Sequence, residues 1–183
     1  CTIARSQKGA DEEMMKVLPS TNLGHPVAPA HQGYPSSSAL PLFLWKGEVS
    51  DALKASPTRT FPFLTPLYGL QHRGSNSSLW TEFFVDTADN GRLHVAAGIL
   101  ENVKDRRILG LGGRWTLDRI LEILRRLEPG KAFPENFSGD EDPNEVEGLD
   151  RSGQLLRDLG RPGWTTLEES IGGLVEDMRK SHP

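Results

Sequence analysis

The stretch ILGLGGRWTLDRILEIL, residues 108–124, carries the clearest structural pattern in the chain. It consists of an apolar run, a glycine-rich turn and an amphipathic helix, the order in which a dinucleotide-binding fold presents its phosphate loop. Apolar residues recur at helical spacing over 117–127, Thr116 is placed as the N-cap, and Pro129-Gly130 ends the helix. The segment predicts a strand-to-helix unit, and it raises the question of whether a nucleotide binds at its glycines.

The spacing of these glycines argues against a dinucleotide site. Gly110, Gly112 and Gly113 are followed by Trp115, where the fingerprint needs its third glycine for close packing of helix against strand. The acidic residue expected roughly 20 positions later would fall within 126–134, inside the helix and its exit. We therefore predict a glycine-rich strand-to-helix turn that holds no cofactor.

Strand and helix patterns alternate along the rest of the chain. The predicted elements are a strand entering a loop within 14–24, a short helix within 38–48, a buried strand over 81–86, a helix over 88–100, a strand over 106–112, a helix near 154–159 and a last helix from TTLEES. Asp86 or Thr87 caps the helix over 88–100. The last helix starts with a capping box, either Thr165 with Glu168 or Thr166 with Glu169. The alternation predicts an α/β fold with a parallel sheet.

Length and composition limit the class of protein. The 183 residues predict a single domain over 1–183, with the sheet half in 17–128, a loop inserted at 49–80, and an acidic loop and C-terminal helices in 129–183. The net charge is −4 and no basic stripe is present, so nucleic acid is not an expected partner. No apolar run approaches the roughly 20 residues of a membrane helix. One cysteine fits a reducing compartment, so a cytoplasmic protein is expected.

Three segments carry a family resemblance: FVDTADNGRLHVAAGIL, RILGLGGRWTLDRILEILRRLEPGKAFPENF and QLLRDLGRPGWTTLEESI. In order and spacing they resemble the C-terminal half of extended short-chain dehydrogenases/reductases, in the dihydroflavonol-reductase-like and NAD-dependent epimerase/dehydratase branch. VLPSTNLG and HQGYPSS resemble the strand and loop that follow the catalytic helix of that branch. The resemblance implies a partial Rossmann-type parallel sheet with a C-terminal helical substrate-binding subdomain.

The same resemblance implies machinery that this sequence lacks. The family holds NAD(P) with an N-terminal glycine loop and protonates the substrate carbonyl with a Tyr-x-x-x-Lys pair and a serine. Here Tyr34 and Tyr68 are followed four residues later by Ser38 and His72, and no glycine triplet of the right spacing precedes residue 17. The prediction is the substrate-binding half of an NAD(P)-dependent reductase or epimerase acting on a carbonyl-bearing small metabolite. Residues 1–183 would have no hydride-transfer machinery and no cofactor of their own.

Two alternatives remain open at this point. A cofactor-independent isomerase or cyclase of secondary metabolism would use the insertion, where Tyr68 and His72 share a face if helical and can exchange a proton near neutral pH. The preferred interpretation of both residues is nevertheless that they belong to an ordinary loop. The other alternative is a non-catalytic module of a hetero-oligomer. An orphan sheet edge and an uncovered apolar face predict a dimer or association with a missing N-terminal half.

The expected ligand is a small apolar metabolite with a carbonyl or hydroxyl group. Asn22 is the central candidate because a turn amide offers two donors and one acceptor. Phe83 and Phe84 point to opposite faces of a strand, and Phe84 is chosen as the one that meets the ligand. The full set of predicted substrate-binding residues is Pro19, Thr21, Asn22, Tyr34, Trp80 and Phe84, with Tyr68 and His72 as catalytic candidates.

The remaining polar residues are expected to be structural. His25 and His31 lack further ligands at metal spacing, so no metal is predicted. Asp86 and Asp89 lie where helix caps belong, and His94 lies within a helix near its apolar side. A hydrogen-bonded structural histidine is the preferred interpretation of His94.

Overall fold

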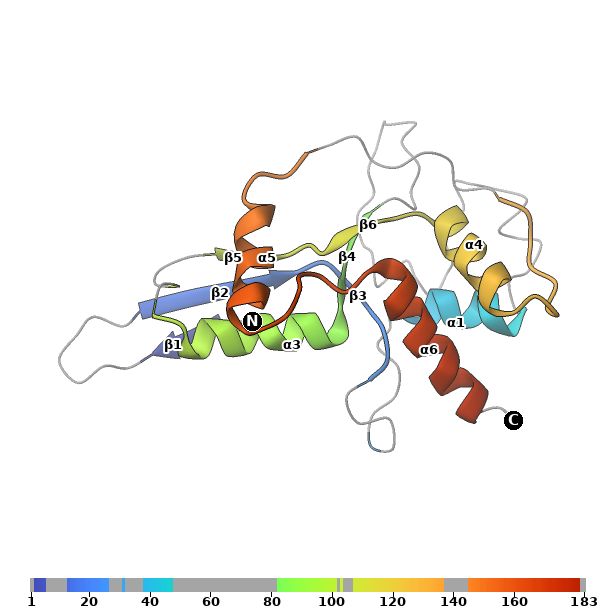
Figure 1. Ribbon diagram of the computed structural model, residues 1–183, viewed down its shortest axis with the longest axis horizontal. Coiled ribbons are helices and arrows are strands. Elements are labelled where there is room, and N and C mark those ends of the chain that lie inside the picture. Colours follow the sequence, from blue (N-terminus) through green and yellow to red (C-terminus); the bar gives the residue numbers. More distant parts are fainter. Residues whose placement is uncertain are drawn as a thin grey trace.

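The computed structural model describes residues 2–5, 13–26, 31, 38–47, 82–101, 103, 107–136 and 145–181. Figure 1 shows an elongated arrangement in which the strands run along the middle and the helices gather towards either end. The elements in chain order are β1 Thr2–Arg5, β2 Glu13–Pro19, β3 Thr21–Leu23, α1 Ala39–Lys46, β4 Glu82–Asp86, α3 Thr87–Ile99, β5 Arg107–Gly110, β6 Gly113–Trp115, α4 Leu117–Leu127, α5 Leu149–Asp158 and α6 Leu167–Ser181.

The strands form two three-stranded sheets, one in the order β1-β2-β5 and the other in the order β3-β4-β6. In the first sheet β2 pairs parallel with β5 and antiparallel with β1. In the second sheet β4 pairs parallel with β3 and antiparallel with β6. This mixed arrangement confirms the predicted α/β class. It also places the strand predicted over 81–86 in a different sheet from those at 14–20 and 106–112.

The chain crosses between the two sheets twice over very short connections. Ser20 separates β2 from β3, and both its N–H and its hydroxyl donate to the carbonyl of Gly110 at 3.0 and 2.8 Å. Leu111 and Gly112 separate β5 from β6, and the Gly112 N–H donates to the carbonyl of Phe84 at 2.7 Å. Where the strand pairing ends, these bonds give hydrogen-bond partners to backbone groups that would otherwise have none. The two sheets are therefore joined at a defined place.

The sheet β1-β2-β5, with α3 and α5, forms what we call the β2 lobe. Helix α3 packs against β2, and α5 packs against α3 and β5. Its core holds mostly small or medium side chains, which are Val17, Leu93, Ala96, Ala97, Val103, Ile108, Leu155 and Leu156. Alternation along β2 buries Val17 and leaves Leu18 42% exposed.

The sheet β3-β4-β6, with α1, α4 and α6, forms what we call the β4 lobe. Helices α4 and α6 each contribute five buried residues to its core, because each has an apolar stripe at helical spacing. Helix α6 packs against α4, and α1 packs against both. The core consists of Leu23, Leu44, Trp45, Phe84, Trp115, Leu117, Ile120, Leu121, Ile123, Leu124, Leu167, Ile171, Leu174, Val175 and Met178.

The helix ends follow the predicted caps. Asp86 is the N-cap of α3, and Thr116 caps α4 by accepting from the N–H of Arg119 at 3.1 Å. Of the two registers left open for the last helix, the structure has Thr166 with Glu169. The Thr166 N–H donates to the Glu169 carboxylate at 2.8 Å, and the Thr166 hydroxyl accepts from the Glu169 N–H at 3.2 Å. Local sequence therefore determines where these helices begin.

The predicted direct turn from strand to helix in residues 108–124 is wrong in one respect. The chain forms a second strand, β6, before α4 begins. Gly113 pairs with Phe84, and a Cβ on Gly113 would lie 3.0 Å from the Phe84 ring. The pairing with β4 is a long-range contact, which local periodicity over three residues does not report.

Candidate functional site

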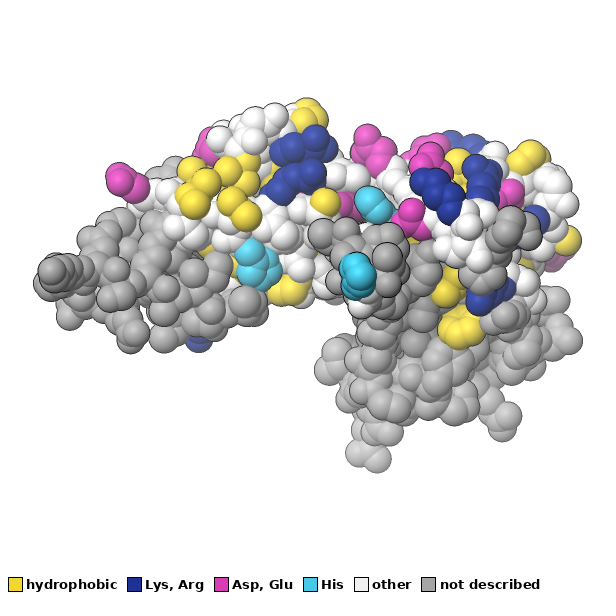
Figure 2. All heavy atoms as spheres, turned by 90° about the horizontal axis from the view of Figure 1, so that it is seen from below, with side chains coloured by type: hydrophobic (Ala, Val, Ile, Leu, Met, Phe, Trp, Pro, Cys, Tyr) yellow, Lys and Arg dark blue, Asp and Glu magenta, His cyan; other side chains and the backbone are white. Residues whose placement is uncertain are grey.

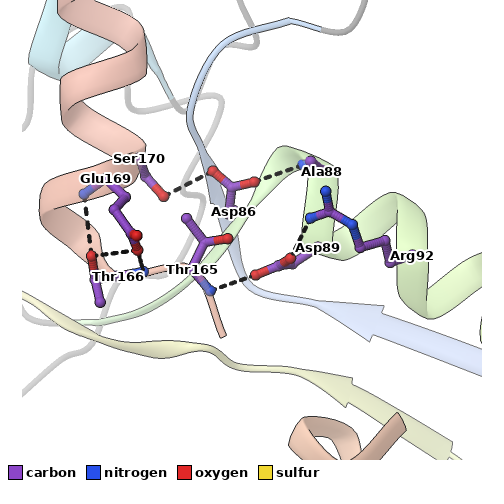
Figure 3. Close-up of polar contacts among 8 residues, drawn as sticks. All are labelled: Asp86, Ala88, Asp89, Arg92, Thr165, Thr166, Glu169 and Ser170. Atoms are coloured by element: carbon purple, nitrogen blue, oxygen red, sulfur yellow. Dashed lines mark hydrogen bonds and ion pairs between the residues drawn. The ribbon is translucent and has the colours of Figure 1, made fainter. Parts of the chain in front are cut away.

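A cluster of carboxylates and hydroxyls joins the two lobes where β4 leads into α3. Asp86 accepts from the Ala88 N–H at 2.8 Å through one oxygen and from the Ser170 hydroxyl of α6 at 2.8 Å through the other. Asp89 is fully buried, pairs with Arg92 at 2.6 Å and accepts from the Thr165 N–H at 2.7 Å. Figure 3 shows the two carboxylates pointing towards the segment that leads into α6.

The close fit at this cluster explains why residue 24 is a glycine. Gly24 has a φ of 109°, and a Cβ there would lie 2.6 Å from an oxygen of Asp86. The Thr87 hydroxyl donates to the Leu23 carbonyl at 3.1 Å, which fixes the end of β3 against the start of α3. Asp86 is a cap as predicted, whereas Asp89 bonds the segment before α6. The cluster is a structural joint, since every carboxylate oxygen in it has a protein donor.

His94 also has a structural role, as predicted. Its Nδ1 lies 2.8 Å from the carbonyl of Asn90, one turn earlier in α3. The ring therefore satisfies a local backbone group and is half-buried on the helix. Among the described residues, no group of three or more His, Cys, Asp or Glu side chains is arranged to hold a metal ion.

The glycine run is closed by protein atoms rather than open to a phosphate. A Cβ on Gly110 would lie 3.0 Å from the Cα of Pro19. A Cβ on Gly112 would lie 3.1 Å from the Trp164 indole and 3.3 Å from the Phe84 carbonyl. These glycines are required for close packing between strands and against Trp164. The residues at this turn do not fit the pyrophosphate of a dinucleotide, which needs exposed backbone N–H groups at a helix N-terminus.

The predicted residues of the β2–β3 connection lie together. Pro19 ends β2 opposite Gly110, and Thr21 and Asn22 begin β3 opposite Phe84 and Val85. The Asn22 amide donates to the Ser20 carbonyl at 3.3 Å, and its oxygen accepts from the Asn90 amide at 2.8 Å. The side chain of Asn22 therefore stabilises this turn against α3 in addition to any contact with a ligand.

The structure describes two cavities next to the strand pair β4-β6. The first has a volume of about 400 Å³ and lies against the start of α4 and α6. The second has a volume of about 360 Å³ and lies against the segment 145–150. Phe83 and Arg114, which face each other in the β4-β6 register, line both cavities.

Of the predicted substrate residues, Phe84 lines the first cavity. Phe83, which the prediction passed over in favour of Phe84, lines both cavities. Phe84 is only 2% exposed because it also belongs to the core of the β4 lobe, whereas Phe83 is half-buried. Pro19, Thr21 and Asn22 line neither of these two cavities. Tyr34, Tyr68, His72 and Trp80 lie outside the described residues, so their roles stay predictions.

Sequence reasoning missed Arg114 and Arg119. The Arg114 guanidinium carbon lies 4.8 Å from the centroid of the Phe83 ring, a cation–π contact. Arg119 belongs to the first turn of α4 and lines the first cavity. Arg114 follows Gly112-Gly113 directly, and its place beside Phe83 depends on the long-range pairing of β4 with β6.

Comparison with known proteins places this fold. No family model matches the chain. The chain is 30% identical over 164 residues to aldehyde reductase 2 of Sporidiobolus salmonicolor, covering 87% of this chain and 39% of that protein. It is 33% identical over 109 residues to the NAD-dependent epimerase/dehydratase terH of Aspergillus terreus, covering 57% of this chain and 29% of that protein. The crystal structure of Gre2 from Candida albicans matches with a TM-score of 0.60 and 21% identity, over 92% of this chain and 45% of Gre2.

These matches confirm the predicted resemblance. In sequence the chain resembles a reductase and an NAD-dependent epimerase/dehydratase, as expected of the extended short-chain dehydrogenases/reductases, and in fold it resembles Gre2. It spans less than half the length of each of these three proteins. In the described residues, no helix is both long enough and apolar enough to cross a membrane.

Proposed function

We propose that residues 1–183 form the substrate-binding half of an NAD(P)-dependent reductase that acts on the carbonyl group of a small metabolite. The observation that carries this proposal is the similarity over 164 residues to an aldehyde reductase of which the chain covers 39%. A second support is the lack of a Tyr-x-x-x-Lys pair in the sequence. Hydride transfer would then require residues from a further segment of the same protein or from a partner chain.

The described contacts support a division of labour in which this chain does not hold the dinucleotide phosphates. Gly110 and Gly112 are covered by Pro19, Trp164 and Phe84, so they offer no cradle for a pyrophosphate. No step of hydride transfer is therefore assigned to these residues. What the chain offers is a cavity with two phenylalanines and two arginines, which suits the binding and orientation of a substrate with apolar and polar parts.

A partner for the β2 lobe is part of the proposal. Val95 and Ile99, four residues apart on α3, are 53% and 62% exposed. Figure 2 shows hydrophobic side chains gathered on the side of the molecule that carries α3. Exposed apolar side chains of this size are typical of a surface that another chain or domain covers. Because the chain spans less than half the length of its relatives, we expect an NAD(P)-binding half to cover this surface.

The alternative of a cofactor-independent isomerase or cyclase depends on Tyr68 and His72 in the insertion at 49–80. These residues lie outside the described ranges, and no contact among the described residues favours that alternative. It stays a prediction from the sequence.

Thermal unfolding of the 183-residue chain tests the proposed function. We expect 4-phenyl-2-butanone, a ketone with an apolar body, to raise Tm, and NADPH alone to leave Tm unchanged, because only the ketone binds in this half. The chain should also fail to oxidise NADPH with that ketone. A Tm increase with NADPH, turnover by the chain alone, or no response to the ketone would each contradict the proposal.

A matched pair of variants tests whether the ketone also contacts Asn22, which lines neither of the two cavities. Asn22→Ala should weaken ketone binding by about 10-fold because one hydrogen bond to the carbonyl is lost. Asn136→Ala, at an exposed asparagine that accepts from Arg125 at 2.8 Å, should leave it unchanged. Circular dichroism of both variants separates loss of binding from loss of the β2–β3 turn, since Asn22 also bonds Asn90.

A further inference from the structure

The cavity of about 400 Å³ beside β6 is lined by two basic side chains and by apolar surface. Arg114 comes from β6 and Arg119 from the first turn of α4. Phe83, Phe84 and Leu167 contribute the apolar part. Among the described residues that line it, none is acidic. The neighbouring cavity of about 360 Å³ differs in this respect because it is lined by Glu145, Glu147 and Asp150.

The Arg114 side chain has a contact that precedes any ligand, whereas for Arg119 it is the backbone that is fixed. The Arg114 guanidinium carbon lies 4.8 Å from the centre of the Phe83 ring. This contact limits the rotamers of Arg114 and keeps its guanidinium group near the cavity. The backbone of Arg119 is fixed by the cap, since its N–H donates to the Thr116 hydroxyl at 3.1 Å. Preorganised guanidinium groups bind a carboxylate more strongly than mobile ones because less side-chain entropy is lost.

The acidic residues at the start of α6 are engaged elsewhere. Glu169 accepts from the Thr166 N–H and hydroxyl at 2.8 and 2.7 Å, which lowers the pKa of the Glu169 carboxyl. Glu168 pairs with Arg126 at 2.9 Å. Thr166 and Leu167, at the N-terminus of α6, line the same cavity, where the helix dipole favours negative charge. The charges around this cavity therefore favour an anion.

We propose that this cavity binds an anionic group, such as a carboxylate, on a ligand whose flat apolar body lies against Phe83 and Leu167. Arg114 and Arg119 bind the anion, and the apolar residues contact the body of the ligand. This inference rests on the proposed function in that the ligand is the carbonyl substrate, which would then be an acidic metabolite. Binding of the anion itself requires neither NADPH nor a second chain.

Isothermal titration of the 183-residue chain with phenylacetate and with phenylacetamide tests the inference. The two probes share their apolar body and differ in charge. We expect phenylacetate to bind about 10-fold more tightly, as one charge-assisted hydrogen-bonded pair predicts, and to weaken as salt is added. Equal affinities for the two probes, or no binding of phenylacetate, would overturn the inference.

Three variants locate the site. Arg119→Gln and Arg114→Met should each reduce phenylacetate affinity by about 10-fold and leave phenylacetamide affinity unchanged. Arg157→Gln makes the same charge change at an exposed residue of α5 and should have no effect. In Arg114→Met, the methionine keeps an apolar side chain over Phe83. If that variant does not fold, Arg119→Gln, at an exposed residue, still tests whether the anion binds in this cavity. A preference for phenylacetate that survives Arg119→Gln would place the anion elsewhere and refute the inference.

These results can be distinguished from those for the proposed function. The ketone used there carries no charge, so a ketone response without anion preference supports the substrate half and refutes the acidic substrate. The reverse result, anion preference with no ketone response, supports the cavity and refutes the carbonyl reductase. Neither measurement involves turnover.

Discussion

The β2 lobe and the β4 lobe are built from similar numbers of strands but differ in how completely they are closed. The β4 lobe buries two tryptophans and a continuous stripe of leucines and isoleucines between three helices. The β2 lobe has a core with two alanines and two valines, and it leaves Leu18, Val95 and Ile99 exposed. The comparison indicates that the β4 lobe supplies most of the stability and the cavity. The exposed apolar side chains of the β2 lobe are the surface that we propose a further half covers.

The largest effect is expected in the core of the β4 lobe. Leu121 is fully buried in α4, so Leu121→Ala should reduce the free energy of unfolding by about 3 kcal/mol through lost burial and a cavity. Urea unfolding followed by circular dichroism measures the change. The matched control Leu127→Ala, at a partly buried position of the same helix, should cost roughly half as much.

Leu93→Ala sharpens the comparison because Leu93 is equally buried but lies in the β2 lobe. We expect both alanine variants to shift one cooperative transition, since the Asp86–Ala88 cap bond and the Asp89–Thr165 bond join the lobes. Two separate transitions, with Leu93→Ala moving only one of them, would show that the lobes unfold independently.

The joint between the lobes gives the next largest effect. Asp86→Ala removes the cap of α3 and leaves the buried Ser170 hydroxyl without its acceptor, so about 2 kcal/mol of stability should be lost. Asp86→Asn keeps a side-chain oxygen for one of these bonds and should lose less. Equal losses in the two variants, measured by thermal unfolding, would contradict the assignment of the carboxylate as a double acceptor.

A glycine substitution separates packing from phosphate binding. A Cβ on Gly112 would meet the Trp164 indole at 3.1 Å, so Gly112→Ala should cost about 1 to 2 kcal/mol by overpacking. Gly172→Ala in α6 meets nothing within 4 Å and should stabilise the helix by up to about 1 kcal/mol. If Gly112→Ala leaves stability unchanged, the turn is not closed by Trp164 and the phosphate-loop interpretation regains support.

The smallest effect concerns acid stability of the β4 lobe. The Trp45 indole N–H donates to Glu128 at 3.0 Å and Arg179 pairs with it at 2.9 Å, and together they lower the pKa of the Glu128 carboxyl. A carboxyl whose folded pKa is depressed stabilises the protein above its ordinary pKa, and this contribution disappears as the pH falls through the folded pKa.

Glu128→Gln should therefore lose about 1 kcal/mol at neutral pH and nothing relative to the parent near pH 2. Thermal unfolding across this pH range measures the difference. Glu122→Gln, at an exposed carboxylate on the same helix, serves as the control and should show no such convergence. A gap between Glu128→Gln and the parent that stays constant with pH would contradict the ion-pair explanation.

Much of the β4 lobe was predictable from the sequence because its helices carry their own start signals. Thr116 caps α4 as expected, and the Thr166–Glu169 pair, one of the two predicted registers, caps α6. In the β2 lobe, α5 has no side-chain cap and begins five residues before its predicted start. The candidate site was less predictable. Phe84 lines the first cavity, but its contact with a ligand stays a prediction. Arg114 was not named from the sequence, because its place in this cavity depends on the β4-β6 pairing.

The sequence by itself determined the α/β class, the helix boundaries and the relationship to short-chain dehydrogenases/reductases, since periodicity, caps and motifs are local properties of the chain. Only the tertiary structure decided that the strands divide into two sheets, that the glycines pack against Pro19 and Trp164, and that two arginines share a cavity. Each of these depends on contacts between residues far apart in the chain. Their energies come from burial and hydrogen bonding across sheets, which no window of neighbouring residues contains.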